Sequence, residues 1–112
     1  MFRVEQFNDI IKNGLAEVII GEVEAPNFLI TISRVSCSSD LAVAKVFVSI
    51  LPENFSGTAL KKLRNKSGVL AKLLKNKTRI IKVPRFIWLI DEDLKKMAEF
   101  DKTMDEIREE EL

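Results

Sequence analysis

Ten basic side chains, and no acidic one, fall between residues 61 and 85. A cluster of this kind can bind anions, above all the repeated phosphate groups of a nucleic acid. Ser67 and Gly68 interrupt the leucine spacing of the segment, and a residue without a side chain lets an anion approach the backbone closely. The candidate binding residues are therefore Lys61, Lys62, Arg64, Lys66, Ser67, Gly68, Lys72, Lys75, Lys77, Arg79, Lys82 and Arg85.

The net charge of the whole chain conceals this cluster. The protein has 18 basic and 17 acidic residues, so its formal charge is only +1. Residues 1–60 carry −3, residues 61–85 carry +10 and residues 86–112 carry −6. Such asymmetry indicates an anionic partner, although a solvated helix face is the alternative interpretation of the basic segment.

Several kinds of chemistry are disfavoured by what the sequence lacks. It contains no His, and Cys37 is its only cysteine. Internal disulfides, the usual zinc sites and His-based catalytic triads therefore cannot form. Acid–base catalysis would have to use carboxylates or lysines, and no nucleophile–base pair or phosphate-binding loop is present. We expect no catalytic residue, no metal site and no cofactor.

Three other residues could act on a ligand, and each has a structural alternative. Phe86 and Trp88 could stack on nucleic-acid bases, but within an apolar segment packing in the core is favoured. Cys37 could be a reactive thiol, but no basic neighbour in the sequence would lower its pKa. The acidic end is a solubilising tail or folds over the basic segment.

Length and hydropathy indicate a single cytoplasmic domain. A chain of 112 residues with 46% hydrophobic and 31% charged residues is typical of one globular domain, here residues 1–112. No segment approaches the roughly 20 apolar residues of a membrane span, and the N-terminus lacks the pattern of a secretion signal. We therefore expect no membrane partner.

The first half of the chain predicts a helix followed by two strands. Apolar residues recur at helical spacing from Phe2 to Ile20, and Gly21 and Pro26 end the pattern. Alternation of period two predicts a strand from Phe28 to about Ser36 and a second from Leu41 to Leu51, which Pro52 ends. The short polar link between them predicts an antiparallel hairpin.

The second half predicts the elements that present the basic segment. Ser56-Gly57-Thr58 could cap a helix, and Ser67-Gly68 predicts that two short helices meet there, because Gly/Ser pairs kink helices. The leucine and valine positions of these helices should face the core. The basic residues that avoid those positions should project into solvent, namely Lys61, Lys62, Arg64, Lys72 and Lys75. Residues 79–90 predict a strand in which Pro84 lies at an edge or bulge. Residues 91–112 predict an acidic tail helix with a frayed end and Leu94, Met97, Met104 and Ile107 on one face.

The order helix, strand, strand, helix, helix, strand predicts an α+β fold. It is the layout of a type II KH domain (α-β-β-α-α-β), here with a Ser-Gly kink between helices and an added C-terminal helix. KH domains hold a nucleic-acid backbone over a glycine-containing turn between two helices. Helix N-termini and a bare glycine can receive a phosphate there. The basic segment is therefore predicted to bind RNA, although the usual Gly-x-x-Gly is absent.

Nearly the whole chain resembles the ribosome-binding factor A family. Its most specific match, residues 38–49, reads SSDLAVAKVFVS and resembles the family pattern S-x-D-L-x-x-A-x-V-x-V-S. Val83-Pro84 with Trp88 and Asp91 resembles V-P-E-L-x-F-x-x-D, and Ser67-Gly68 falls on the last two positions of the family's Ala-x-Gly kink. The sequence departs at Lys66, where the family has alanine, at Arg85, where it has an acid, and in an acidic end that replaces a basic extension.

The resemblance implies a non-catalytic assembly factor of the small (30S) ribosomal subunit. Such a protein binds 16S rRNA, assists late maturation and rRNA processing, and is released with help from a ribosome-associated GTPase. We expect it to act as a monomer. Two alternatives stay open: a general single-stranded RNA-binding KH-like module without a ribosomal role, and a protein-interaction module that uses the acidic tail. A small enzyme that uses carboxylates and lysines is the least supported.

Overall fold

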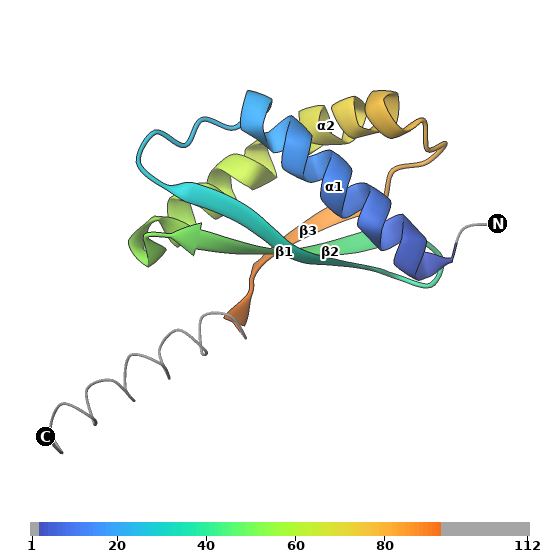
Figure 1. Cartoon of the computed structure of the whole chain (residues 1–112), viewed down its shortest axis with the longest axis horizontal. Helices are drawn as coiled ribbons and strands as arrows, with labels where there is room; N and C mark the ends of the chain where they lie inside the picture. The colour runs from blue at the N-terminus through green and yellow to red at the C-terminus, as the bar shows by residue number, and fades with distance from the viewer. Residues whose placement is uncertain (1–2, 93–112) are drawn as a thin grey trace, which may run out of the picture.

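A computed structural model describes residues 3–92, in which two helices lie on one side of a three-stranded sheet (Figure 1). The elements are helix α1 (Val4–Glu22), strands β1 (Leu29–Cys37) and β2 (Val43–Leu51), a short 3-10 turn (Glu53–Phe55), helix α2 (Ser56–Thr78) and strand β3 (Arg85–Ile90). The predicted α+β class is confirmed. The predicted tail helix at 91–112 lies outside the described residues from residue 93 onward.

Strand β2 lies in the centre of the sheet, antiparallel to β1 and parallel to β3. The predicted hairpin is therefore confirmed. The parallel pairing of β2 with β3 requires a crossover, which α2 supplies, because parallel strands cannot be joined by a tight turn. α1 packs over β1, and α2 packs beside α1 and against β3.

The hairpin turn is held by Ser38 and Asp40. Ser38 Oγ donates to Asp40 Oδ1 at 2.6 Å, and the same carboxylate oxygen accepts from the backbone N–H of Ala42 at 3.1 Å. The pKa of Asp40 is lowered from its ordinary value, and the hydrogen bond from Ser38 is the largest cause. The first residues of the most specific sequence motif therefore close a turn, as Asx and Ser side chains commonly do.

A β-bulge at Ser33 breaks the period-two pattern of β1. Ile32 pairs with Val48 and Arg34 with Phe47, so Ser33 is the extra residue. Ile32 and Val35 are consequently both buried although they are three residues apart. Ser33 Oγ donates to Asp91 Oδ2 at 2.6 Å, so the residue that follows β3 is tied to β1 across the sheet.

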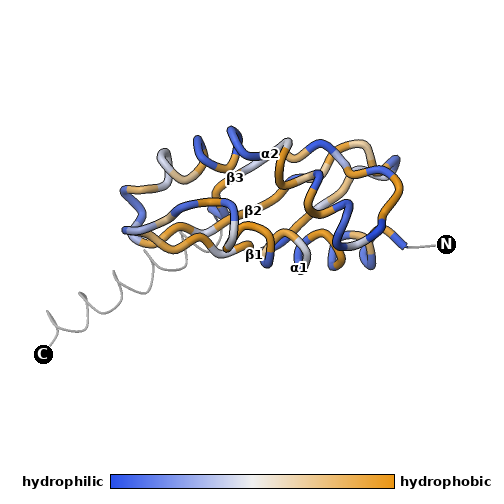
Figure 2. Tube along the Cα trace, turned by 90° about the horizontal axis from the view of Figure 1, so that it is seen from above, coloured by the Kyte–Doolittle hydropathy of each residue, from blue (hydrophilic) through white to orange (hydrophobic). Residues whose placement is uncertain are grey.

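The core lies between the two helices and the inner face of the sheet. Its largest fully buried side chains are Trp88, Ile11, Leu15, Leu63, Leu70, Leu74, Val46 and Val48. In Figure 2 hydrophilic and hydrophobic stretches alternate along α2, with hydrophilic turns at its outer edge. Most apolar positions predicted to face inward do so, but Val69 is 44% exposed and does not.

α1 ends differently from the prediction. Gly21 lies inside the helix and has no positive φ, and the helix ends at Glu22 with Val23 in extended conformation. The glycine that matters for packing is Gly14, which is buried. A Cβ there would clash with Leu74 Cδ1, so the absent side chain lets α1 approach α2 closely.

α2 is one helix of 23 residues, so the expectation of two separate helices is wrong. Gly68 lies within it, and a kink at that point stays a prediction. A glycine costs about 1 kcal/mol inside a helix, whereas burial of one leucine contributes about 1.5–3 kcal/mol. Leu63, Leu70 and Leu74 are completely buried on either side of Gly68, and their packing outweighs the cost of the glycine.

The beginnings of α2 and β3 also correct the sequence predictions. α2 directly follows the 3-10 turn, and no side chain caps its N-terminus, so the predicted cap from Ser56-Gly57-Thr58 is wrong. Ser56 Oγ instead donates to the carbonyl of Glu53 at 2.7 Å. Residues 79–84 form a loop, not the start of a strand. Arg79 has a left-handed conformation (φ 58°) that ends α2, and Pro84 immediately precedes β3. Among the helices of residues 3–92, none is long and apolar enough to cross a membrane.

Candidate nucleic-acid interface

α2 presents one row of basic side chains on the side opposite the core. Residues 61, 64, 68, 72 and 75 are three or four positions apart, so they share one face of the helix. We call this row the outward stripe: Lys61, Arg64, Gly68, Lys72 and Lys75, all of which are exposed. The prediction that these four basic side chains project into solvent is confirmed.

Nothing in the described structure neutralises the outward stripe. Within residues 3–92 its four basic side chains make no ion pair and no side-chain hydrogen bond. Gly68 lies at the middle of the row, and apart from its chain neighbours and the helix's own backbone no atom lies within 4 Å of the position that a Cβ would occupy there. The stripe therefore combines uncompensated positive charge with an open stretch of backbone.

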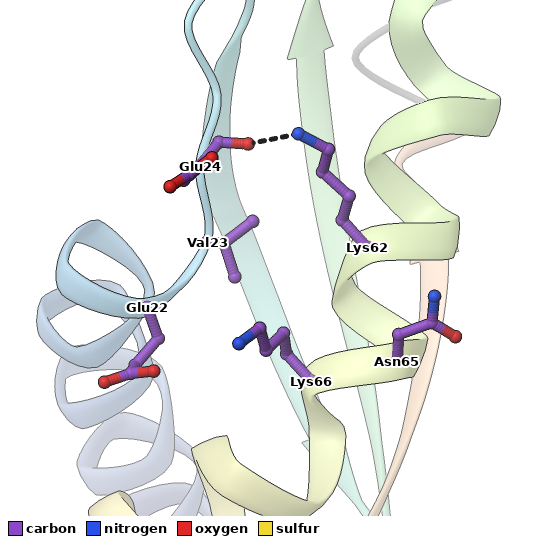
Figure 3. Close-up of a pocket in the computed structure, with 6 residues that line it drawn as sticks. All are labelled: Glu22, Val23, Glu24, Lys62, Asn65 and Lys66. Atoms are coloured by element: carbon purple, nitrogen blue, oxygen red, sulfur yellow. Dashed lines mark hydrogen bonds between the residues drawn. The ribbon is translucent and has the colours of Figure 1, made fainter.

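A second set of lysines lies on the side of α2 that faces α1. Lys62, Lys66 and Lys77 form this set, which we call the α1-side lysines. Lys62 Nζ donates to the carbonyl of Glu24 at 2.7 Å (Figure 3). The same Nζ lies 5.6 Å from the centre of the Phe28 ring. Lys62 is half-buried, so the prediction that it projects into solvent is wrong.

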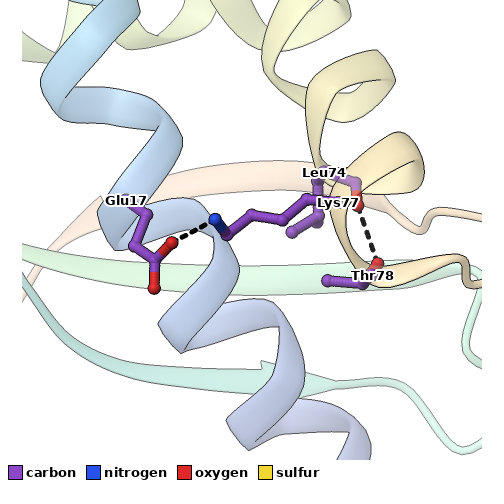
Figure 4. A network of polar contacts seen from close by, with 4 residues as sticks. All are labelled: Glu17, Leu74, Lys77 and Thr78. Atoms are coloured by element: carbon purple, nitrogen blue, oxygen red, sulfur yellow. Dashed lines mark hydrogen bonds and ion pairs between the residues drawn. The ribbon is translucent and has the colours of Figure 1, made fainter.

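The other two α1-side lysines also face groups of α1 or the loop after it. Lys66 lines a hollow with Glu22 and Glu24 (Figure 3). Lys77 forms an ion pair with Glu17 of α1, and next to it Thr78 Oγ1 donates to the carbonyl of Leu74 (Figure 4). Lys62 and Lys77 therefore bind groups that belong to the fold, unlike the stripe residues.

Ser67 connects α2 to β3. Trp88 Nε1 donates to Ser67 Oγ at 2.7 Å, and Ser67 Oγ donates to the carbonyl of Leu63 at 3.0 Å. Trp88 is 2% exposed and packs edge-on against Phe86, with ring centroids 5.7 Å apart. The prediction that these aromatic residues belong to the core is confirmed. Ser67 fixes the stripe relative to the sheet.

The last three predicted binding residues follow α2 in the chain and line two different hollows. Arg79 and Lys82 line a hollow with Asp40, whose pKa the charge of Lys82 helps to lower. Arg85 begins β3 and lines a groove of about 440 Å³ together with Arg64 and Ser67. The groove therefore extends the outward stripe toward the edge strand, whereas Arg79 and Lys82 lie outside it.

The comparison with family models decides which family this chain represents. The model of the family described as "Ribosome-binding factor A" matches residues 3–104. The chain belongs to the ribosome-binding factor A family. A relative of that name from Thermodesulfovibrio yellowstonii is 29% identical over 107 residues, which cover 95% of this chain and 91% of the relative.

Solved structures of the same family share the fold. The crystal structure of ribosome-binding factor A from Thermus thermophilus is 28% identical in sequence and has a TM-score of 0.71. The match covers 80% of this chain and 97% of the Thermus thermophilus chain. A homology model of the Thermus thermophilus factor was fitted into a cryo-EM map of a 30S–RbfA complex. This model is 28% identical in sequence and has a TM-score of 0.67, and the match covers 77% of this chain and 92% of the fitted chain. The KH-like character of the fold is thereby shown.

Within this ribosome-binding factor A fold, two features of the site were missed from the sequence. The basic segment was treated as one surface, although its members separate into the outward stripe, the α1-side lysines and the loop residues. Helical spacing along an uninterrupted helix would have revealed the separation. The link between Ser67 and Trp88 joins residues 21 apart, and no local pattern signals such a pair.

Neither the thiol of Cys37 nor any group of metal-binding side chains in residues 3–92 forms a reactive site. Cys37 is half-buried, its backbone N–H donates to Asn8 Oδ1 at 2.9 Å, and burial raises the pKa of its thiol. A raised pKa disfavours the reactive thiolate, which supports the structural interpretation. In residues 3–92 no three His, Cys, Asp or Glu side chains are grouped so that they could hold a metal ion.

Proposed function

We propose that this protein binds the small (30S) ribosomal subunit and its 16S rRNA and assists late maturation and rRNA processing in the cytoplasm. The outward stripe is the proposed contact surface. The observation that carries the proposal is a row of four exposed basic side chains around the bare backbone of Gly68, none of which has an ion-pair partner within residues 3–92. Membership of the ribosome-binding factor A family supports the ribosomal partner.

The geometry of the stripe fits a nucleic-acid backbone better than a single small anion. Lys61 and Lys75 are 14 residues apart on one helix, which corresponds to about 21 Å at 1.5 Å per residue. Successive phosphates of a strand lie several ångströms apart, so several of them can be contacted along this length. Such contacts position the RNA without reading its sequence. Specificity must then come from RNA shape or from the ribosomal context.

The groove beside the stripe offers a second set of contacts. Arg64 and Ser67 of α2 and Arg85 of β3 line it together. Planar guanidinium groups bind phosphate through two parallel hydrogen bonds and also stack on exposed bases. We infer that RNA crosses from the stripe into this groove. Arg85 replaces an acid of the family pattern, so this contact is a property of the present chain.

The rest of the proposed role concerns how the protein acts and leaves. It acts without catalysis, by occupying rRNA that has not reached its final fold. A ribosome-associated GTPase then releases it, and the protein works as a monomer. These steps rest on the family resemblance.

Crosslinking in cells, followed by mapping of the bound RNA, tests the proposal. The proposal expects enrichment of small-subunit rRNA by the unchanged protein. It also expects loss of this enrichment in a variant with Lys61→Gln, Arg64→Gln, Lys72→Gln and Lys75→Gln. Even recovery of unrelated RNAs would instead support the alternative, a general single-stranded RNA-binding KH-like module, which predicts similar affinity for any RNA.

A further inference from the structure

The hollow that Arg79 and Lys82 line is not explained by RNA binding along the outward stripe. Three segments meet around it at one end of the molecule: the first half of α1, the turn between β1 and β2, and the loop that joins α2 to β3 (Figure 1). The hollow has a volume of about 470 Å³, which lies in the range of sites that hold ligands. We call it the end hollow.

Much of the wall of the end hollow is aliphatic. Its half-buried or exposed apolar residues are Ile10, Leu41, Ile80 and Ile81. Ile81 is 92% exposed, the highest value among the large apolar side chains of residues 3–92. A single exposed isoleucine is common, but several apolar side chains around one hollow with a charged rim are typical of an interaction site.

The loop that carries Ile81 is fixed at both ends and unpaired between them. The N–H groups of Arg79 and Arg85 donate to backbone carbonyls of α2 and of the hairpin turn, both at 2.9 Å. Between them, the N–H groups of Ile80, Ile81 and Lys82 donate to no other group within residues 3–92. A partner therefore meets exposed apolar side chains and free backbone donors on a loop whose ends are already held in place.

The charged groups of the end hollow are Arg79, Lys82 and Asp40. The carboxylate of Asp40 already accepts hydrogen bonds from Ser38 Oγ and from the backbone N–H of Ala42. Neither basic side chain makes an ion pair or a side-chain hydrogen bond with another group of the described residues. Two basic groups against one acid leave an excess of positive charge, which fits a partner that carries a carboxylate or a phosphate.

The chemistry of the wall favours a protein segment over RNA. Among the described residues that line the hollow, Phe7 is the one aromatic residue, and it is only 6% exposed, so a base has no open ring on which to stack. The hydroxyl of Thr78 is already bonded to the carbonyl of Leu74. Aliphatic walls instead favour the burial of another aliphatic side chain. The acidic group of the partner is therefore a carboxylate.

We propose that the end hollow binds a short segment of another protein that presents a large aliphatic side chain with an acidic residue close to it. The aliphatic side chain packs against Leu41 and Ile81, and the carboxylate binds Arg79 or Lys82. The site lies outside the outward stripe, so RNA and a partner protein can be held at the same time. The inference goes beyond the proposed function and does not depend on RNA binding.

Selection of short random peptides from a displayed library tests the chemistry of the end hollow. The full-length protein is the target, and Ile81→Ser is the variant, because a side chain exposed to this extent contributes little to the fold. The matched control is Ile20→Ser, since Ile20 is 84% exposed and lies on α1 in a different hollow. Unchanged unfolding midpoints check that both variants are folded.

The proposal expects the unchanged protein and the Ile20→Ser control to enrich peptides that have an aliphatic residue beside, or one helical turn from, an acidic one. An enriched peptide, measured by fluorescence anisotropy, should bind the Ile81→Ser variant at least about tenfold more weakly, because burial of an aliphatic side chain is lost. Lys82→Gln should weaken binding several-fold and reduce its dependence on salt. The variant of the outward stripe with four substitutions should bind the peptide normally, which separates this inference from the proposed function.

Equal affinity of the peptide for the unchanged protein and the Ile81→Ser variant would overturn the proposal. So would a selection that enriches no peptide, or only peptides without an acidic residue. Weaker binding of a short oligouridine by the Ile81→Ser variant would assign the hollow to RNA instead. A dimer of the unchanged protein that this variant converts to a monomer in sedimentation would assign it to a second copy of the chain.

Discussion

On one side of α2, Lys62 and Lys77 bind Glu24 and Glu17, which belong to α1 or the loop after it. On the opposite side, the four basic residues of the outward stripe have no partner within the described part of the chain. Both sets come from one uninterrupted basic segment of the sequence. Charge density along the sequence therefore identifies a basic segment as a candidate binding region. Which of its side chains can contact a ligand depends on whether each one already binds another group of the protein.

The largest effect should come from the buried side of α2. Leu70→Ala removes a fully buried side chain two residues from Gly68 and should lower the free energy of unfolding by about 2–5 kcal/mol. Urea denaturation measures this loss. RNA affinity of the fraction that stays folded should change little, because Leu70 does not face the stripe. A small loss of stability would show that packing does not hold Gly68 within the helix.

A smaller effect should follow from breaking the link between α2 and β3. Ser67→Ala leaves the buried indole N–H of Trp88 without a partner and should cost about 1–3 kcal/mol. Trp88→Phe in the Ser67→Ala background should then cost less than in the unchanged protein, because both partners of the hydrogen bond are gone. A double-mutant cycle of unfolding free energies measures this coupling, and simple additivity would contradict it.

The smallest effect should come from the α1-side lysines. Lys62→Gln together with Lys77→Gln should lower stability by less than about 1 kcal/mol, because the Lys77–Glu17 pair is exposed and the Lys62 bond is a single contact. RNA affinity should stay within about threefold of the unchanged protein, since both groups already bind within the fold. A large loss of RNA binding would show that the α1-side lysines also contact RNA.

The sequence predicted the parts of the fold that depend on local patterns. The hairpin followed from two alternating stretches and a polar link, and the Ser38–Asp40 turn lies where the family motif begins. The bulge at Ser33 was not predictable, because period-two alternation assumes an unbroken ladder. The continuity of α2 through Gly68 was missed for a different reason. Local propensity disfavours it, and only the buried leucines on both sides override that preference.

The candidate site was predicted in composition but not in arrangement. All twelve predicted residues lie on or just beyond α2, yet Lys62 and Lys77 bind within the fold and Arg79 and Lys82 line a separate hollow. Pairing of this kind depends on which groups α1 and the hairpin turn bring near α2. Such long-range proximity is set by tertiary packing, which a local charge count does not describe.

Co-sedimentation with purified small ribosomal subunits shows whether the outward stripe binds the subunit. It compares the unchanged protein with the fourfold stripe variant (Lys61→Gln, Arg64→Gln, Lys72→Gln and Lys75→Gln), and the Lys62→Gln, Lys77→Gln variant is the matched control. We expect the stripe variant to bind at least about 100-fold more weakly. The slope of log affinity against log salt should fall by about 3, since about four phosphate contacts are lost. The control should bind normally. Full binding by the folded stripe variant would show that the outward stripe is not the surface that contacts the subunit.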